Sequence, residues 1–143
     1  MSKPIRYLKR TYLLMRKALD ERLAAHGLTT SQFEILGFLY GEPPIEQGRL
    51  QQRSGVTSAT LTGLLDTLEE RGFLARAASP ADGRAKSVAL TPAGAAFFGQ
   101  LMDVFHDFEG LMLDGFSPAE RALLTDWLRR IARNLGDHDA GDG

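Results

Sequence analysis

The chain has 143 residues, of which 43% are hydrophobic and 24% are charged, and its formal net charge is −1. This length suits one globular domain with a core of ordinary size. The absence of cysteine excludes disulfides, cysteine-ligated zinc and thiol-based redox sensing. No apolar run is long enough to cross a membrane and no export leader is recognisable, so we expect a cytoplasmic protein without membrane contact.

The charges are divided unevenly between the two ends of the chain. Residues 1–22 contain seven Lys or Arg and two acidic residues, whereas residues 103–143 contain four Arg and nine acidic residues. Opposite charges favour contact between these ends, within one chain or across a dimer. Two separate solvated faces explain the same counts equally well, because surface ion pairs contribute little to stability.

The first half of the chain predicts helices only. Apolar residues three and four positions apart, a capping box of Thr29 and Gln32, and glycines at 27, 55 and 72 mark their courses and ends. We predict helices over residues 4–25, 29–40, 45–53 and 57–71.

The second half predicts a hairpin followed by two more helices. Short alternating segments at 73–77 and 86–90 flank the turn residues 80–83, which predicts two strands. A helix follows from Pro92. A capping box of Ser117 and Glu120, with proline at the first helical position, opens a last helix to about Leu135. We expect the Gly/Asp-rich tail, residues 136–143, to be disordered.

The helix predicted over 57–71 has a face suited to a DNA groove. With its leucines turned inward, its N-terminal half presents only small or hydroxylated side chains outward. Small side chains permit close approach to bases, hydroxyls can donate hydrogen bonds, and the positive end of the helix dipole favours phosphate. Ser and Thr near a helix start also serve as ordinary caps. The DNA-binding candidates on this helix are Thr57, Ser58, Ala59, Thr60, Thr62 and Gly63.

The hairpin adds cations directly after this helix. Arg84 follows the Asp82-Gly83 turn and Lys86 lies two residues further on. An arginine at a hairpin tip can enter a narrow minor groove. We expect Asp82 to brace Arg84 or Arg76, and we count Asp82, Arg84 and Lys86 among the DNA-binding candidates.

In this order, several short motifs resemble the MarR-type winged helix-turn-helix transcriptional regulators. They lie at residues 27–29 (GLT), 54–56 (SGV), 68–74 (LEERGFL), 82–84 (DGR) and 90–94 (LTPAG). The resemblance spans about residues 5–135. It implies a mainly α fold, with a small β-hairpin wing and a helical dimerisation region around a winged helix-turn-helix lobe.

The resemblance further implies how the parts are used. Residues 1–28 and 92–135 would form the dimerisation helices and residues 29–91 the DNA-binding lobe. A homodimer would place one recognition helix in each of two successive major grooves of a pseudo-palindromic operator, about 34–36 Å apart. The function implied is that of a repressor released by a small aromatic or anionic effector.

Candidates for the effector site lie on the first two predicted helices. Arg16 stands among apolar residues and could hold a carboxylate, although the general scarcity of such sites favours a solvated arginine or one that braces the dimer. The candidates to bind the effector are Arg16, Tyr12, Phe33, Gly37 and Tyr40. Asp103, His106 and Asp107 share a helix face, but too few nitrogen or sulfur ligands are present for zinc, so we expect neither a metal nor a cofactor.

Two other classes of protein compete with this interpretation. An enzyme is disfavoured because no nucleophile elbow, phosphate loop, dinucleotide motif or zinc-protease motif occurs. A winged helix used for protein contacts, with weak or lost DNA binding, stays open because residues 57–92 hold four cations and four acidic residues. The same balance predicts a shallow salt dependence, with a log–log slope no steeper than about −8.

Overall fold

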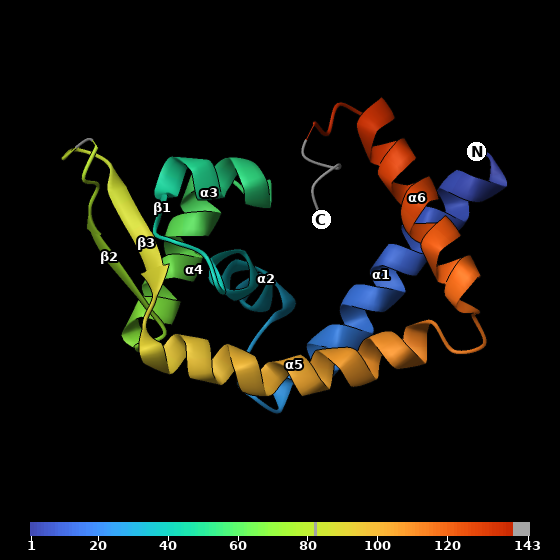
Figure 1. Ribbon diagram of the computed structural model, residues 1–143, viewed down its shortest axis with the longest axis horizontal. Helices are drawn as coiled ribbons and strands as arrows, with labels where there is room; N and C mark the ends of the chain where they lie inside the picture. Colours follow the sequence, from blue (N-terminus) through green and yellow to red (C-terminus); the bar gives the residue numbers. More distant parts are fainter. Residues whose placement is uncertain (82, 139–143) are drawn as a thin grey trace. The chain divides into compact units, whose positions relative to one another are not determined.

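The computed structural model describes residues 1–81 and 83–138 (Figure 1). Asp82 and residues 139–143, which include most of the predicted disordered tail, lie outside this description. The elements in chain order are α1 (Lys3–Ala24), α2 (Thr30–Leu39), β1 (Ile45–Glu46), α3 (Gln47–Ser54), α4 (Ser58–Glu70), β2 (Leu74–Ala78), β3 (Lys86–Leu90), α5 (Pro92–Met112) and α6 (Pro118–Asn134). The predicted mainly α class is confirmed. Contacts divide the chain into two compact units, Met1–Phe105 and His106–Gly143.

The wing has three strands, so the predicted two-stranded hairpin was incomplete. The sheet order is β1-β3-β2, and both pairings are antiparallel. Residues 45–46, predicted as the start of the third helix, instead pair with Val88 and Ser87 of β3. The preceding Pro43-Pro44 favours extended backbone, which delivers Ile45 to the open edge of β3. A two-residue strand with a partner so distant in sequence leaves no local pattern from which to predict it.

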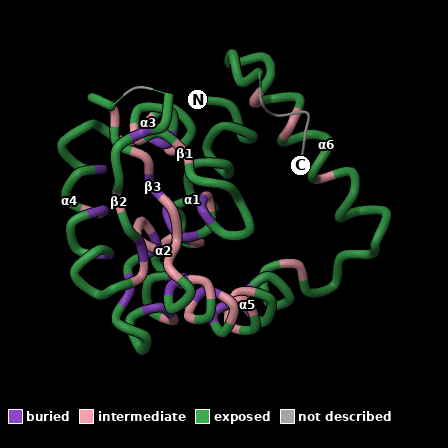
Figure 2. The backbone as a smooth tube through the Cα atoms, turned by 60° about the vertical axis from the view of Figure 1, so that its left-hand side comes forward, coloured by how far each residue is buried: buried purple, intermediate pink, exposed green. Residues whose placement is uncertain are grey.

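The core of the first unit is built mainly from leucines. Leu61, Leu65 and Leu68 of α4 are at most 1% exposed, whereas Leu64, also predicted to face inward, is half-buried. Figure 2 shows buried segments on α2, α4 and β3. Since each fully buried leucine contributes about 1.5–3 kcal/mol, this stripe is enough to hold α4 by one face. Its opposite face stays in solvent.

The end of the wing is joined tightly to the start of α5. The Thr91 hydroxyl donates to the carbonyl oxygen of Gly72 at 2.5 Å, and the Thr91 N–H donates to that of Phe73 at 3.1 Å. A Cβ on Gly94 would overlap the carbonyl oxygen of Phe73, so only glycine fits there. These contacts give the physical reason for the motif at residues 90–94.

The second unit contains the end of α5 and the whole of α6. Ser117 and Glu120 form the predicted capping box, in which the Glu120 N–H donates to the Ser117 hydroxyl oxygen at 3.1 Å. All residues of α6 are described, and none of them is buried. Its hydrophobic stripe is exposed. Across the described residues, none of the helices is both long and apolar enough to span a membrane.

Candidate nucleic-acid interface

The outward face of α4 is slim and polar, as predicted. Thr57 caps the helix by accepting a hydrogen bond from the Thr60 N–H at 3.2 Å. Thr62 is exposed, and its hydroxyl donates to the carbonyl oxygen of Ser58 at 3.0 Å. Ser58, Ala59 and Gly63 are also exposed, and a Cβ on Gly63 would meet no other part of the described chain within 4 Å beyond its own helix. This surface can therefore approach a partner closely and still offer hydroxyl groups.

A groove of about 520 Å³ joins this helix face to the wing. Ser58 and Thr62 of α4 line it together with Arg84 and Lys86 from the wing. The structure thus brings two of the four hydroxylated DNA-binding candidates together with both cationic ones, whereas Thr57 and Thr60 do not line this groove. Hydroxyls beside cations suit the phosphate oxygens and base edges of a nucleic acid.

The groove also contains residues that the sequence analysis missed. Gln47, Gly48 and Gln51 line it from α3, with Glu46 at the junction between β1 and α3. Glu46 accepts a hydrogen bond from the buried Ser79 hydroxyl at 2.9 Å, which ties β1 to the end of β2. Glutamines near a helix start give no distinctive local signal, so only the fold could identify them.

Arg76 of β2 is clamped against the C-terminal half of α4. Its Nη2 lies 2.6 Å from Oδ1 of Asp66 and its Nε lies 2.7 Å from Oε2 of Glu69, while only 15% of its side chain is exposed. The hydrogen bonds to Glu69 and then to Asp66 raise the pKa of Arg76. Asp82, the predicted partner of Arg76 or Arg84, lies outside the described residues. The clamp fixes the wing to α4 and offsets part of the negative charge of two carboxylates that would otherwise repel DNA.

The candidate effector residues form two sets of contacts on α2. Arg16 donates to the side-chain oxygens of Ser31 at 3.0 Å, Glu34 at 3.3 Å and Tyr12 at 3.4 Å. Phe33 lies with its ring centroid 5.2 Å from that of Phe98 on α5. Tyr40 contacts the same ring at 4.8 Å, and a Cβ on Gly37 would reach it at 3.5 Å. Arg16 and Tyr12 therefore meet each other, while Phe33, Gly37 and Tyr40 meet around Phe98.

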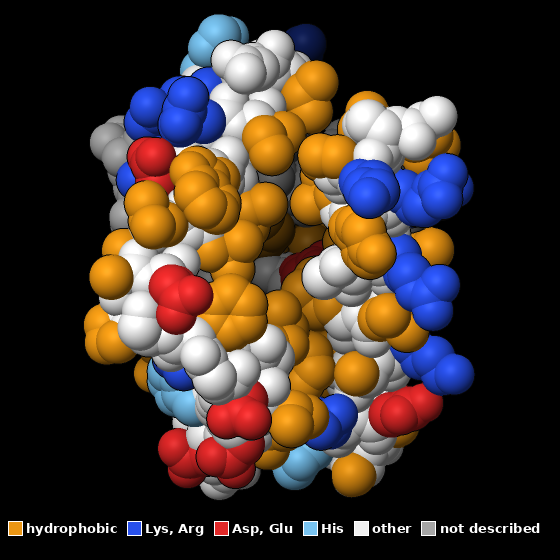
Figure 3. Space-filling view, turned by 90° about the vertical axis from the view of Figure 1, so that its right-hand side faces the viewer, with side chains coloured by type: hydrophobic (Ala, Val, Ile, Leu, Met, Phe, Trp, Pro, Cys, Tyr) orange, Lys and Arg blue, Asp and Glu red, His pale blue; other side chains and the backbone are white. Residues whose placement is uncertain are grey.

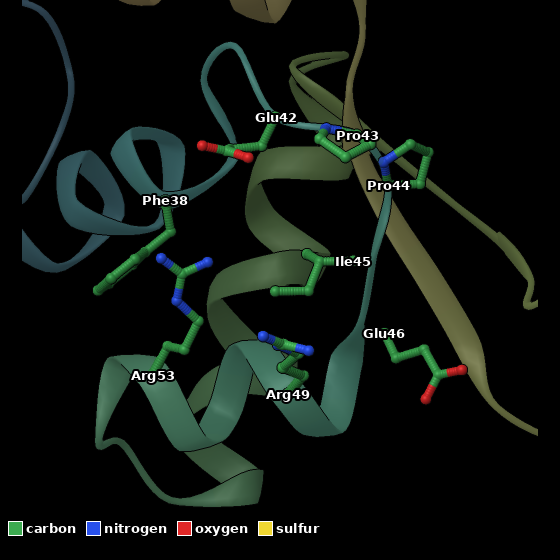
Figure 4. A pocket seen from close by; sticks show the side chains of 8 residues that line it. All are labelled: Phe38, Glu42, Pro43, Pro44, Ile45, Glu46, Arg49 and Arg53. Atoms are coloured by element: carbon green, nitrogen blue, oxygen red, sulfur yellow. The ribbon is translucent and has the colours of Figure 1, made fainter. Parts of the chain in front are cut away.

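A second cavity, of about 510 Å³, lies on the other side of α3 (Figure 4). Arg49 and Arg53 of α3 contribute two positive charges to its lining, and Glu42 and Glu46 contribute two negative ones. The Arg53 guanidinium lies 5.7 Å from the centre of the Phe38 ring. Because the charges balance and Ser58, Thr62 and Arg84 line only the other groove, we do not place DNA here.

Asp103, His106 and Asp107, predicted on one helix face, all fall in α5. Over residues 1–81 and 83–138, no group of three or more His, Asp or Glu side chains could hold a metal ion.

The chain is similar to several known transcriptional regulators. Residues 26–85 match the MarR family. The HTH-type transcriptional regulator MhqR of Bacillus subtilis is 30% identical over 132 residues, covering 89% of this chain and 88% of MhqR. BpsR of Bordetella bronchiseptica, whose DNA binding is regulated by 6-hydroxynicotinic acid, shares 25% identity with a TM-score of 0.82, over 92% of this chain and 99% of BpsR. A mutant of MarR from E. coli in complex with operator DNA shares 27% identity with a TM-score of 0.80, over 88% and 91% of the two chains.

Proposed function

Because this chain belongs to the MarR family of winged helix-turn-helix transcriptional regulators, we propose that it is a homodimeric repressor of a pseudo-palindromic operator. As a member of this family it is a DNA-binding protein and not an enzyme. We assign residues 29–91 to DNA reading, and residues 1–28 and 92–135 to dimerisation. Since it acts on DNA, we place it in the cytoplasm.

The groove between α4 and the wing carries this proposal. It sets the hydroxyls of Ser58 and Thr62 beside the cations Arg84 and Lys86. In our proposal α4 enters the major groove by its N-terminal half, with Thr57, Ala59, Thr60 and Gly63 close to the bases. Arg84, followed by Lys86, reaches the adjacent minor groove, where a narrow A·T-rich segment attracts cations.

The exposed hydrophobic residues support a homodimer. Leu123, Trp127 and Ile131 follow one side of α6 and are 43–53% exposed, and Ile5 and Leu8 of α1 are 58% and 45% exposed. Figure 3 shows many hydrophobic side chains, in orange, at the surface. Hydrophobic surface of this kind on a globular protein marks an interaction site, and a second copy is the commonest partner.

We further propose that a small aromatic carboxylate releases the protein from DNA. Support comes from the similarity to BpsR, whose DNA binding is regulated by 6-hydroxynicotinic acid. It also comes from Arg16, whose guanidinium lies 3.3 Å from the carboxylate of Glu34 and would pair with a ligand carboxylate in its place. In this proposal Tyr12 lines the site beside Arg16. Phe33, Gly37 and Tyr40, which meet separately around Phe98, would form its apolar part.

DNA binding is tested with duplexes from the region upstream of the protein's own gene, measured by fluorescence anisotropy. We expect Arg84→Ala combined with Thr62→Ala to weaken binding by at least about tenfold, because each lost base contact costs about 1–3 kcal/mol. Arg53→Ala, which removes a cation outside the groove, is the control and should bind as the parent does. An unchanged affinity for the double variant would contradict the site assignment. Failure of the parent protein to bind any duplex would favour the protein-contact alternative.

The effector proposal is tested by a thermal-shift series with 6-hydroxynicotinic acid and benzoate. A ligand present at 100 times its dissociation constant should stabilise the protein by about 2.7 kcal/mol. Arg16→Ala should lose this shift, and retention of the full shift would rule out Arg16 as the carboxylate ligand.

A further inference from the structure

Arg71 connects the end of the recognition helix α4 with the end of α1. It is the C-cap residue of α4. Its Nη1 donates to the carbonyl oxygen of Gly27 at 2.6 Å, and its Nη2 donates to that of His26 at 3.4 Å. Both carbonyls belong to the turn directly after α1. These two carbonyls lie just beyond the C-terminal end of α1, where the negative end of the helix dipole attracts a cation.

Two aromatic rings hold the guanidinium in this orientation. Its central carbon lies 4.8 Å from the ring centre of Phe73 and 5.5 Å from that of Phe97. The two rings are stacked on each other at 4.3 Å with an angle of 9° between them. Phe73 leads into β2 and Phe97 belongs to α5. A single side chain therefore contacts the turn after α1, the start of the wing and the start of α5.

Gly27 forms the turn on which the guanidinium lies. Its φ of +70° lies in the left-handed region that favours glycine, and a Cβ there would lie 3.5 Å from Nη2 and 3.6 Å from Nη1 of Arg71. The same glycine thus ends α1 and leaves its carbonyl open to the arginine.

We propose that Arg71 is a positioning residue for DNA recognition, which sets the angle of α4 relative to α1. The inference rests on the proposed homodimer, in which α1 belongs to the dimerisation region. The leucine stripe of α4 attaches the helix to the core by contacts that have no direction. Two hydrogen bonds from a planar group do have direction, so they fix the orientation of α4. Because both protomers contain this contact, it sets the separation of the two reading helices.

The separation is measured by pulsed electron spin resonance. The chain contains no cysteine, so Thr67→Cys on the exposed side of α4 places one spin label on each protomer. We expect one narrow distance distribution for the labelled parent. Adding Arg71→Met, which keeps an apolar chain over the rings but removes every donor, should make the distribution about twofold broader. Arg71→Lys keeps the charge and one donor to Gly27 and should fall between the two.

The matched control is Arg53→Met. Arg53 also lies over an aromatic ring, Phe38, but it has no hydrogen bond to another helix among the contacts of the described residues. Its distribution should equal that of the parent. Should Arg71→Met fail to fold, the width of the distance distribution is compared between the parent and Arg71→Lys, and the distribution of Arg71→Lys should again be the broader one.

A second measurement uses operators selected from random duplexes with the parent protein. Inserting one base pair between the half-sites moves one of them by about 3.4 Å and should cost the parent about tenfold in affinity. For Arg71→Met we expect the same insertion to lower the affinity by less than about threefold, because the separation of its two reading helices is no longer fixed. If the parent and Arg71→Met have equal distance distributions and lose equal affinity on insertion of the base pair, the role assigned to Arg71 is wrong, while the proposed function stands. Absence of spin–spin coupling in the parent would mean no dimer, which overturns the proposed function and this inference with it.

Discussion

Helix α4, the proposed recognition helix, and the C-terminal helix α6 have the same kind of sequence and opposite surroundings. Both are amphipathic. The α4 stripe, represented by Leu61 and Leu65, is at most 1% exposed, whereas Leu123 and Trp127 of α6 are 49% and 53% exposed. Helical periodicity therefore shows which face of a helix needs cover but not what covers it. For α4 the cover comes from its own chain, and for α6 we assign it to a second copy.

The largest effect should come from placing a charge on the exposed stripe of α6. Trp127→Asp removes apolar contact from both protomers, which should cost about 3–6 kcal/mol per dimer and shift the protein to monomer. Sedimentation velocity over a concentration series measures the dissociation constant. Thr125→Asp, on an exposed polar position of the same helix, is the control. If Trp127→Asp dimerises as tightly as the parent, α6 does not form the interface.

The second prediction concerns the buried junction between the wing and α5. Gly94→Ala should lower the free energy of unfolding of the first unit by about 3 kcal/mol. The added Cβ would overlap the Phe73 carbonyl oxygen, so either α5 or the end of the wing has to move. Urea denaturation followed by circular dichroism measures this loss. Gly99→Ala is the matched control, since its Cβ would meet only the Tyr40 hydroxyl at 3.8 Å. Equal stability of the two variants would show that the junction is not rigid.

The exposed face of α4 depends on the clamp beneath it. Arg76→Met should lower DNA affinity by about tenfold, because it frees the wing from α4 and leaves Asp66 and Glu69 unneutralised near the phosphates. Anisotropy titration with the same duplex measures the change. Arg49→Met, which also removes one cation from the lobe but lines the other cavity, should have a much smaller effect. An equal loss in both variants would mean that net charge alone matters.

The smallest effect concerns how α2 is held to α1. Thr30 donates its hydroxyl and its N–H to Oδ1 of Asp20, at 2.6 and 2.8 Å, and these hydrogen bonds lower the pKa of Asp20 below its ordinary value of 3.8. A lowered pKa stabilises the folded state above the ordinary value, and this stabilisation is lost as the pH falls through the folded value. Asp20→Asn should cost about 0.5–1 kcal/mol at pH 7.

That cost should begin to shrink as the pH falls below 3.8 and should vanish below the lowered pKa of folded Asp20, where the protonated side chain resembles asparagine. Urea midpoints of parent and variant, measured from pH 7 to pH 2.5, test this. A difference between the two proteins that does not change with pH would exclude a contribution from the charge.

Much of this protein could be predicted from short segments of its sequence. The helices, both capping boxes and the strands β2 and β3 depend on residues two to four positions apart. The same holds for the polar face of α4, because helical geometry alone turns Thr62 outward once the leucines turn inward. The family could also be identified from ordered local motifs such as residues 90–94.

Other features became visible only in the tertiary structure. Strand β1 has no local sequence signal, because Ile45 pairs with the distant Val88. Gln47 and Gln51 have none either, because only the fold brings α3 beside the wing. The carboxylates that pair with Arg76 and the hydrogen bond from Arg71 to Gly27, 44 residues apart, likewise depend on the fold. Local periodicity records which way a side chain points, whereas its partners depend on the path of the whole chain.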